Sequence, residues 1–72
     1  MSPQERTFTN QQIINAIYAA ARAVGKDGWA LLKQAGLTHL VQDRQGTYQG
    51  PAIAALPGLT AQEKTEVQKA LG

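Results

Sequence analysis

The chain has 72 residues, a net charge of +2 and no cysteine, with 43% hydrophobic and 17% charged residues. This length allows one compact domain, and the apolar content is typical of a globular core rather than a disordered tail. The lack of cysteine excludes disulfides and Cys-ligated zinc or iron–sulfur clusters, so helix packing has to stabilise the domain. No apolar run reaches the roughly 18 residues of a membrane span, and we expect no signal peptide.

Residues 1–7 are polar and contain a proline ahead of the first apolar repeat. Such a stretch is typical of the end of an interdomain linker or of an added leader, and we expect one helical domain over residues 8–72. Whether the domain stands alone or belongs to a longer protein stays open at this point.

The first predicted helix starts at residue 10 and ends at Gly25. Thr9 and Gln12 have the spacing of a capping box, and Phe8 and Ile13 have that of a hydrophobic staple. The residues between them and the glycine repeat with the 3.6-residue period of a helix that buries one face. The apolar positions are Ile13, Ile14, Ile17, Tyr18, Ala20, Ala21 and Val24.

A second predicted helix follows a short turn, with Asp27 as its N-cap and Gly36 at its end. We expect Trp29 to be the central aromatic anchor of the core, because it falls in an apolar repeat. The predicted buried positions are Trp29, Leu32 and Ala35, with Leu31 beside them.

After Gly36, Leu37 and Thr38 repeat the staple-and-cap pattern, which predicts one or two helical turns over residues 39–44 that bury Leu40 and Val41. Residues 45–58 are rich in glycine and proline and predict a long loop. A helical turn over residues 51–56 is compatible with this loop, because proline suits the first turn of a helix.

Within the long loop, Ile53 and Leu56 are expected to reach the core. Thr60 and Glu63 form a second capping box, and the last helix is expected to run to about Leu71. Its apolar residues are Val67, Ala70 and Leu71. The predicted fold is a single all-α domain of three to four short helices with a long loop before the last helix.

Enzyme chemistry is not favoured, and we expect no catalytic residue, metal site or cofactor. The chain has one histidine, His39, and a single carboxylate four residues away, Asp43, makes a weak metal pair with it. Glu63 and Glu66 have the three-residue spacing of neighbouring carboxylates, which glycosidases use in pairs. Both lie in the first turns of a helix, where negative charge favours the helix dipole.

Nucleic-acid binding is the less favoured alternative. The spacing of Ala21, Gly25 and Leu31 resembles that of a helix-turn-helix, although any tight junction of two helices needs a small residue, a glycine and an apolar anchor. The second helix offers only Lys33 and Gln34 to a DNA groove, whereas readers of base edges usually carry several such side chains.

A ligand-binding role is predicted for the long loop. Arg44, Gln45, Tyr48 and Gln49 combine a cation, two amides and an aromatic ring, which are the groups that bind sugars or a partner chain. Of the three larger aromatic residues, we expect Tyr48 to face solvent most readily, since it lies between two glycines. In the alternative interpretation, Tyr48 folds back and covers the edge of the core.

Several short sequence segments occur in the same order as in a known group of modules. They are Thr9 to Asn15 (TNQQIIN), Gly28-Trp29, Ala35-Gly36-Leu37, Asp43-Arg44-Gln45, Tyr48 to Pro51 (YQGP) and Leu56 to Thr60 (LPGLT). Together they resemble the small helical modules appended to lysozyme-type cell-wall hydrolases of bacteria and phages, over residues 8–71.

The resemblance implies a non-catalytic module that attaches the catalytic domain of a parent chain to peptidoglycan or another bacterial polysaccharide. It also implies a location outside the cell or in the cell wall. The alternative is a small helix-turn-helix-like domain that binds DNA or another protein. We expect neither a membrane partner nor a cofactor.

Overall fold

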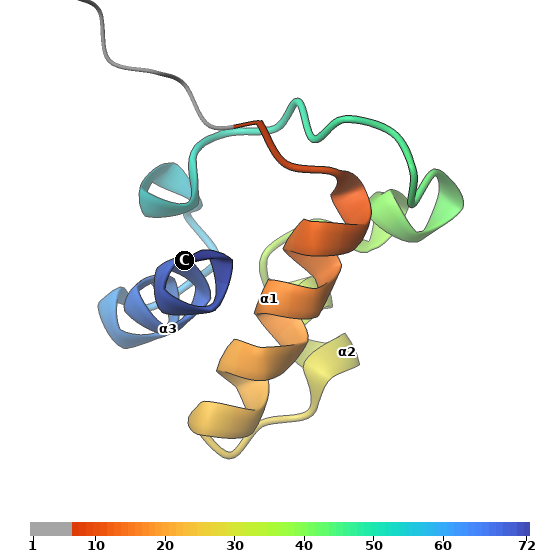
Figure 1. Ribbon diagram of the computed structural model, residues 1–72. Helices are drawn as coiled ribbons and strands as arrows, with labels where there is room; N and C mark the ends of the chain where they lie inside the picture. The colour runs from red at the N-terminus through yellow and green to blue at the C-terminus, as the bar shows by residue number, and fades with distance from the viewer. Residues whose placement is uncertain (1–6) are drawn as a thin grey trace, which may run out of the picture.

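Three α-helices and two 3₁₀ helices form the part of the chain that the computed structural model describes, residues 7–72 (Figure 1). These residues contain an isolated β-bridge between Thr9 and Thr47 and no strand, so the predicted all-α class is confirmed. Of the predicted leader, residues 1–6 lie outside the described residues. The elements are α1 (Asn10–Ala23), α2 (Gly28–Gln34), η1 (Thr38–Gln42), η2 (Ile53–Ala55) and α3 (Ala61–Leu71).

The three α-helices begin where their capping residues predict. Thr9 accepts a hydrogen bond from the Gln12 amide, and the Gln12 side chain accepts one from the Thr9 amide at 2.8 Å. Thr60 starts α3 with the same reciprocal pair of bonds, and Asp27 accepts a bond from an amide in the first turn of α2. Each cap satisfies amides that have no partner inside their own helix.

α1 and α2 both end in a glycine of left-handed conformation, Gly25 at φ 73° and Gly36 at φ 74°. The amide of the residue after each glycine donates a hydrogen bond to a carbonyl of the preceding helix. Lys26 donates to Ala21 at 2.8 Å, and Leu37 donates to Leu32 at 3.1 Å. This is the Schellman arrangement, and glycine is favoured at its left-handed position because it has no Cβ. The predicted helix ends are confirmed.

The third predicted helix is a 3₁₀ helix, and its predicted cap is wrong. Thr38 is the first residue of η1, and no side chain caps this helix. The reason is the short connection, because Leu37 is already used to close α2 and has no extended conformation to offer as an N-cap. Leu40 is buried as predicted, whereas Val41 is half-buried.

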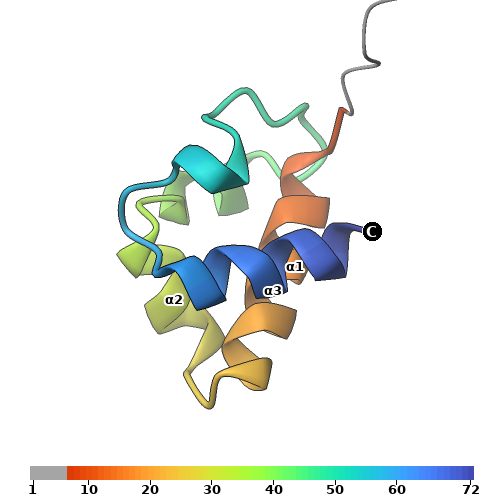
Figure 2. The ribbon, with the colours of Figure 1, turned by 90° about the vertical axis from the view of Figure 1, so that its left-hand side faces the viewer.

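Helix α1 forms the centre of the molecule, with α2 packed against one side and α3 crossing it on another (Figures 1 and 2). Its inward face is a repeat of isoleucine and alanine that is inaccessible to solvent. Ile53 and Leu56 reach the core from the long loop, as predicted, while Ala70 is exposed. The other elements add Leu31, Leu32, Ala35, Leu37, Leu40, Leu59 and Val67.

Trp29 does not belong to the core, and the prediction of a central anchor is wrong. Its relative exposure is 40%, whereas Leu31 and Leu32 are fully buried. At about 100° per residue, Trp29 lies about 110° around the helix from the centre of the face that carries Leu31, Leu32 and Ala35. In a helix of seven residues, the apolar repeat is too short to show whether the Trp29 side or the side with Leu31 is buried.

The loop that precedes η2 is fastened to the N-terminus of α1 (Figure 1). The Asn10 amide donates to the Gly46 carbonyl at 2.8 Å, and the Gln11 amide donates to the Arg44 carbonyl at 2.9 Å. The Asn10 side chain donates to the Asp43 carbonyl at 2.8 Å. Since these helix amides lack intrahelical partners, the loop stabilises α1 while α1 fixes the loop.

Glu63 connects α3 to the rest of the domain. Its side chain is 2% exposed and forms an ion pair with Lys26, which follows α1. It also accepts a hydrogen bond from Gln34 of α2 at 2.9 Å and one from the Thr60 amide at 2.8 Å. Gln34 in turn donates to the Gly58 carbonyl at 2.8 Å. We call Lys26, Gln34 and Glu63 the Glu63 cluster.

The Glu63 cluster favours the ionised carboxylate. The hydrogen bond from Lys26 and the one from the Thr60 amide hold the pKa of Glu63 below its usual value, although burial acts in the opposite direction. The charge is therefore paired in the folded state and unpaired in the unfolded state. Stability gained in this way is present above the ordinary glutamate pKa and is lost as the pH falls through the lowered one.

Trp29→Ala is expected to cost about 1 kcal/mol of unfolding free energy, far below the 3 to 5 kcal/mol of a buried aromatic residue. The matched control Leu32→Ala removes a fully buried side chain and is expected to cost about 2 to 5 kcal/mol. Urea unfolding followed by circular dichroism measures both. Similar losses of unfolding free energy in the two variants would show that Trp29 contributes to the core after all.

Glu63→Gln is expected to lower the unfolding free energy by about 1.5 to 3 kcal/mol near neutral pH, because a charge-assisted hydrogen bond is lost. Glu66→Gln is the control, since Glu66 forms only a surface pair with Lys69 at 3.5 Å and should change stability by less than about 0.5 kcal/mol.

The same variants test the pH dependence. The parent chain and Glu66→Gln are expected to lose stability as the pH falls below about 4.3, the ordinary glutamate value, because the unfolded chain then takes up a proton at Glu63 that the folded chain binds only at lower pH. Glu63→Gln should show a flatter profile in this window in urea titrations. If Glu63→Gln lost unfolding free energy equally steeply at acid pH, a carboxylate other than Glu63 would be responsible.

Candidate functional site

The four loop residues predicted to bind a ligand do not converge on one site. Arg44 and Tyr48 line two different grooves, and the side chains of Gln45 and Gln49 are exposed and line neither of them. Nothing tests their roles in binding, so the loop site stays a prediction. The two grooves have different chemistry.

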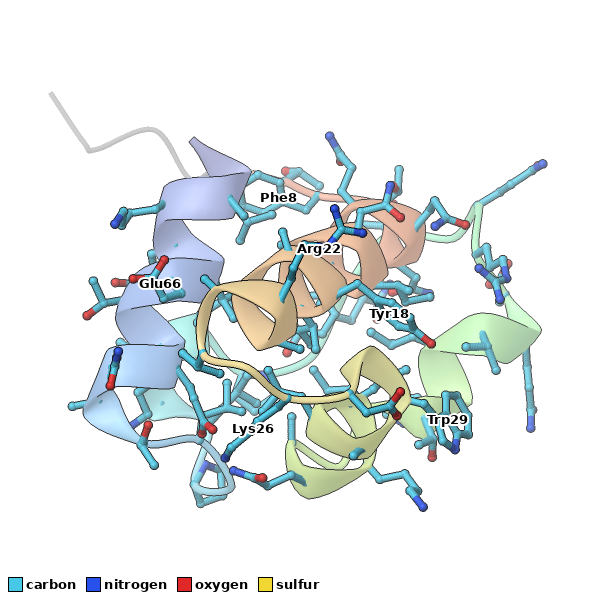
Figure 3. The ribbon with its side chains drawn as sticks, turned by 90° about the horizontal axis from the view of Figure 1, so that it is seen from below. Phe8, Tyr18, Arg22, Lys26, Trp29 and Glu66 are labelled. Atoms are coloured by element: carbon cyan, nitrogen blue, oxygen red, sulfur yellow. The ribbon has the colours of Figure 1, made fainter. Side chains whose placement is uncertain are left out.

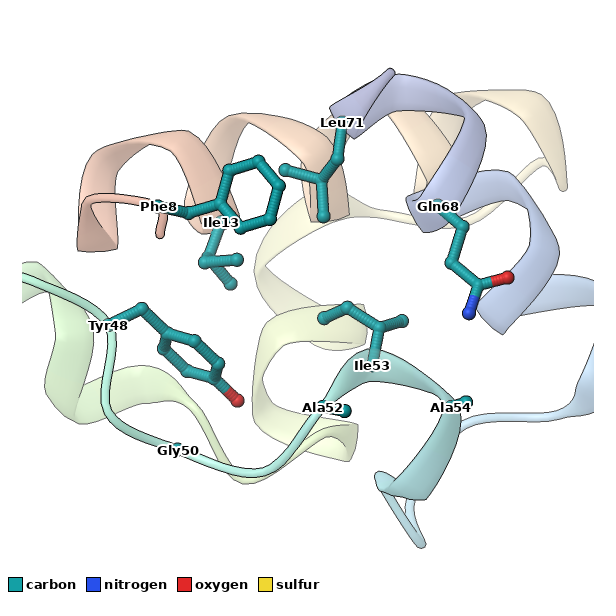
Figure 4. Close-up of a pocket in the computed structure, with 9 residues that line it drawn as sticks. All are labelled: Phe8, Ile13, Tyr48, Gly50, Ala52, Ile53, Ala54, Gln68 and Leu71. Carbon is teal, nitrogen blue, oxygen red and sulfur yellow. The ribbon is translucent and has the colours of Figure 1, made fainter. Parts of the chain in front are cut away.

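The first groove, the Tyr48 groove, has a volume of about 580 Å³ and lies between the long loop, η2 and the end of α3 (Figure 4). The Tyr48 hydroxyl donates a hydrogen bond to the Pro51 carbonyl at 2.7 Å, and burial raises the pKa of this hydroxyl. The walls are mainly apolar. They consist of Phe8, Ile13, Tyr48, Gly50, Ala52, Ile53, Ala54, Gln68 and Leu71.

Tyr48 is half-buried and packs against the core, and its amide donates to the Phe8 carbonyl at 2.8 Å. The two aromatic residues expected to be less exposed, Tyr18 and Trp29, are 44% and 40% exposed. The predicted order of exposure is therefore wrong. The hydrogen bond to Pro51 and the β-bridge beside it turn the Tyr48 ring inward, which two flanking glycines alone do not indicate.

The second groove, the α1 groove, has a volume of about 440 Å³ and runs along the outer face of α1. Four of its residues recur at helical spacing: Gln11, Asn15, Tyr18 and Arg22 lie within about 60° of one another around α1. Ile14 and Ala19 line it from the same helix, and Arg44 lines it from the loop that is hydrogen-bonded to the N-terminus of α1.

The polar groups that line the α1 groove include amides and two arginines. Arg44 donates a hydrogen bond to the Gln11 side chain at 3.2 Å, and Gln11 donates to Asn15 at 2.8 Å. The guanidinium group of Arg22 has no hydrogen-bond or ion-pair partner among residues 7–72. Among residues 7–72, no acidic side chain lines this groove.

The carboxylates nearest in sequence to the two arginines of the α1 groove, Asp27 and Asp43, form other contacts. Asp27 is the N-cap of α2 and accepts the Ala30 amide at 3.0 Å. The Asp43 carboxylate lies over Gly46, where any Cβ would meet it at 2.3 Å. The two arginines of the α1 groove therefore keep their positive charge unneutralised in the described part of the chain.

The Tyr18 ring lies against the backbone of Gly28, where a Cβ would meet the ring at 2.4 Å. Trp29 follows Gly28 directly, and both aromatic side chains point to the same side of the molecule in Figure 3. Since each is about two-fifths exposed, an aromatic surface continues the α1 groove toward α2. This surface was not predicted from the sequence, although the helical spacing of Gln11, Asn15, Tyr18 and Arg22 indicates it.

The remaining candidate residues occupy ordinary positions. His39 is exposed on η1, and residues 7–72 contain no group of three or more metal-ligating side chains. Glu63 is engaged by the α3 cap and Lys26, and Glu66 pairs with Lys69. Of the described residues, those that line the two grooves include no nucleophile paired with a base.

The helix-turn-helix spacing has a packing explanation. Ala21 and Leu31 are fully buried between α1 and α2, and Gly25 closes α1. Of the two side chains offered to a DNA groove, Gln34 is bound to Gly58 and Glu63, while Lys33 is exposed. One of the two polar side chains that the second helix offers to a DNA groove is therefore already bound within the domain.

Comparison with family models, curated proteins and solved structures gave no match to this chain. Over residues 7–72, no helix has the length and apolar character needed to span a bilayer.

Proposed function

We propose that this chain is a non-catalytic module that binds a polysaccharide, and that the ligand is the peptidoglycan of bacterial cell walls. The observation that supports this most directly is the exposure of Tyr18 beside the amides of the α1 groove, with Trp29 exposed on the same side of the molecule. Exposed aromatic faces with neighbouring amides are suited to stacking on sugar rings and to hydrogen bonds with hydroxyl groups.

The absence of a nucleophile–base pair from both grooves supports a binding role, because hydrolysis needs such a pair or two suitably placed carboxylates. The resemblance to modules of lysozyme-type hydrolases supports the same proposal. In this account, the module attaches a parent catalytic domain to the wall from outside the cell.

The α1 groove replaces the long loop as the proposed binding surface. Arg44 belongs to both sets of residues, since its backbone lies in the loop while its side chain reaches Gln11 on α1. Tyr48 stabilises the loop in this account, because its ring is half-buried and its hydroxyl is bound to Pro51.

Depletion from solution by purified peptidoglycan tests the proposal. Tyr18→Ala is expected to weaken binding by about 1 to 3 kcal/mol, the scale of stacking on an aromatic ring, while the thermal midpoint changes little. Tyr48→Ala is the matched control, because it makes the same chemical change in the other groove. It is expected to lower the midpoint and to leave the affinity of the folded fraction unchanged.

Each result has a distinct meaning. Loss of binding in Tyr48→Ala but not in Tyr18→Ala would restore the loop site. No depletion of the parent chain at high micromolar concentration would contradict the polysaccharide proposal. Tight, salt-sensitive binding to duplex DNA in its place would favour the helix-turn-helix alternative.

A further inference from the structure

The charged residues of the α1 groove are both cations, and they lie at opposite ends. Arg44 is held beside Gln11 at the start of α1, whereas Arg22 lies in its last turn. Eleven residues of helix separate positions 11 and 22, which corresponds to about 16 Å along the axis. Tyr18 lies between the two ends, so the groove has a cation, an aromatic ring and a second cation in line.

This linear arrangement suits an extended chain better than a single small anion. A lone carboxylate or phosphate would contact one arginine and leave the other without a partner. A chain that lies along α1 can place one anionic group at each end and a flat ring on Tyr18. The planar guanidinium group matches a carboxylate with two parallel hydrogen bonds.

We propose that the α1 groove recognises a linear glycan that carries carboxylates, and that Arg22 and Arg44 bind two of these groups along one chain. The proposal rests on the proposed function and names the chemistry of its ligand. Peptidoglycan carries free carboxylates on its peptide stems, so the wall polymer itself supplies the required groups. The arginines are specificity residues that select the charged polymer over a neutral one.

The observations favour a glycan over a nucleic acid. Within the described part of the chain, the groove offers the amides of Gln11 and Asn15 for hydroxyl groups and two cations, whereas nucleic-acid surfaces neutralise many phosphates. Arg22 in the last turn of α1 also favours the helix dipole, but that effect requires no aromatic or amide neighbour.

The test uses the full 72-residue chain and bacterial sacculi stripped of wall phosphopolymers by hydrofluoric acid. One sample keeps its carboxylates, and a second has them converted to amides with carbodiimide and ammonium chloride. Amidation is expected to weaken binding about tenfold or more. Arg22→Gln and Arg44→Gln should each weaken binding to the carboxylate form roughly threefold to tenfold and have no effect on the amidated form.

Lys33→Gln is the matched control, because it removes an exposed positive charge from α2 outside the groove. It should bind like the parent chain, and thermal unfolding should show that all three variants are folded. An equal loss in Lys33→Gln would indicate a general charge effect and would overturn the proposal.

Other results separate this inference from the function on which it depends. Equal binding to amidated and untreated sacculi overturns carboxylate recognition and leaves the binding module intact. Binding only to sacculi that retain their phosphopolymers overturns the carboxylate assignment in favour of phosphate. Tighter binding to DNA than to any sacculus, or no binding to either, overturns both proposals.

Discussion

The buried Glu63 carboxylate is the constraint on which the arrangement of the helices depends. It caps α3 through the Thr60 amide, pairs with Lys26 behind α1 and accepts a hydrogen bond from Gln34 of α2. A buried charge is costly unless it is paired and hydrogen-bonded, so an arrangement in which the three helices meet at this point is favoured. The apolar core supplies most of the stability, while this cluster fixes which helix ends lie together.

Once the helix ends are fixed, α1 has two faces with different tasks. Its inner face of isoleucine and alanine is covered by α2 and α3, and its N-terminus is closed by the carbonyls of Arg44 and Gly46. Closing the N-terminus brings the Arg44 side chain to Gln11, at one end of the outer face. The proposed binding surface is thus a consequence of how the loop satisfies the helix amides.

The helix boundaries could be predicted from sequence because the caps are local. Thr9, Asp27 and Thr60 each bond to an amide within three residues, and Gly25 and Gly36 close their helices within one turn. The exposure of the aromatic side chains could not be predicted in the same way. Trp29 lies in a helix too short for its apolar repeat to define a face, and the position of Tyr48 depends on long-range bonds to Phe8 and the start of α1. The loop site was predicted from residues that are neighbours in the sequence, whereas the α1 groove brings together residues 33 positions apart.

A nitrogen-15 NMR titration with soluble peptidoglycan fragments released by a muramidase tests the central claim most directly, because it locates the bound ligand without any substitution. The account predicts that the largest shift changes occur at Gln11, Asn15, Tyr18, Arg22 and Arg44, with smaller ones at Trp29. Changes confined to residues 48–54, or no changes at fragment concentrations in the millimolar range, would contradict it.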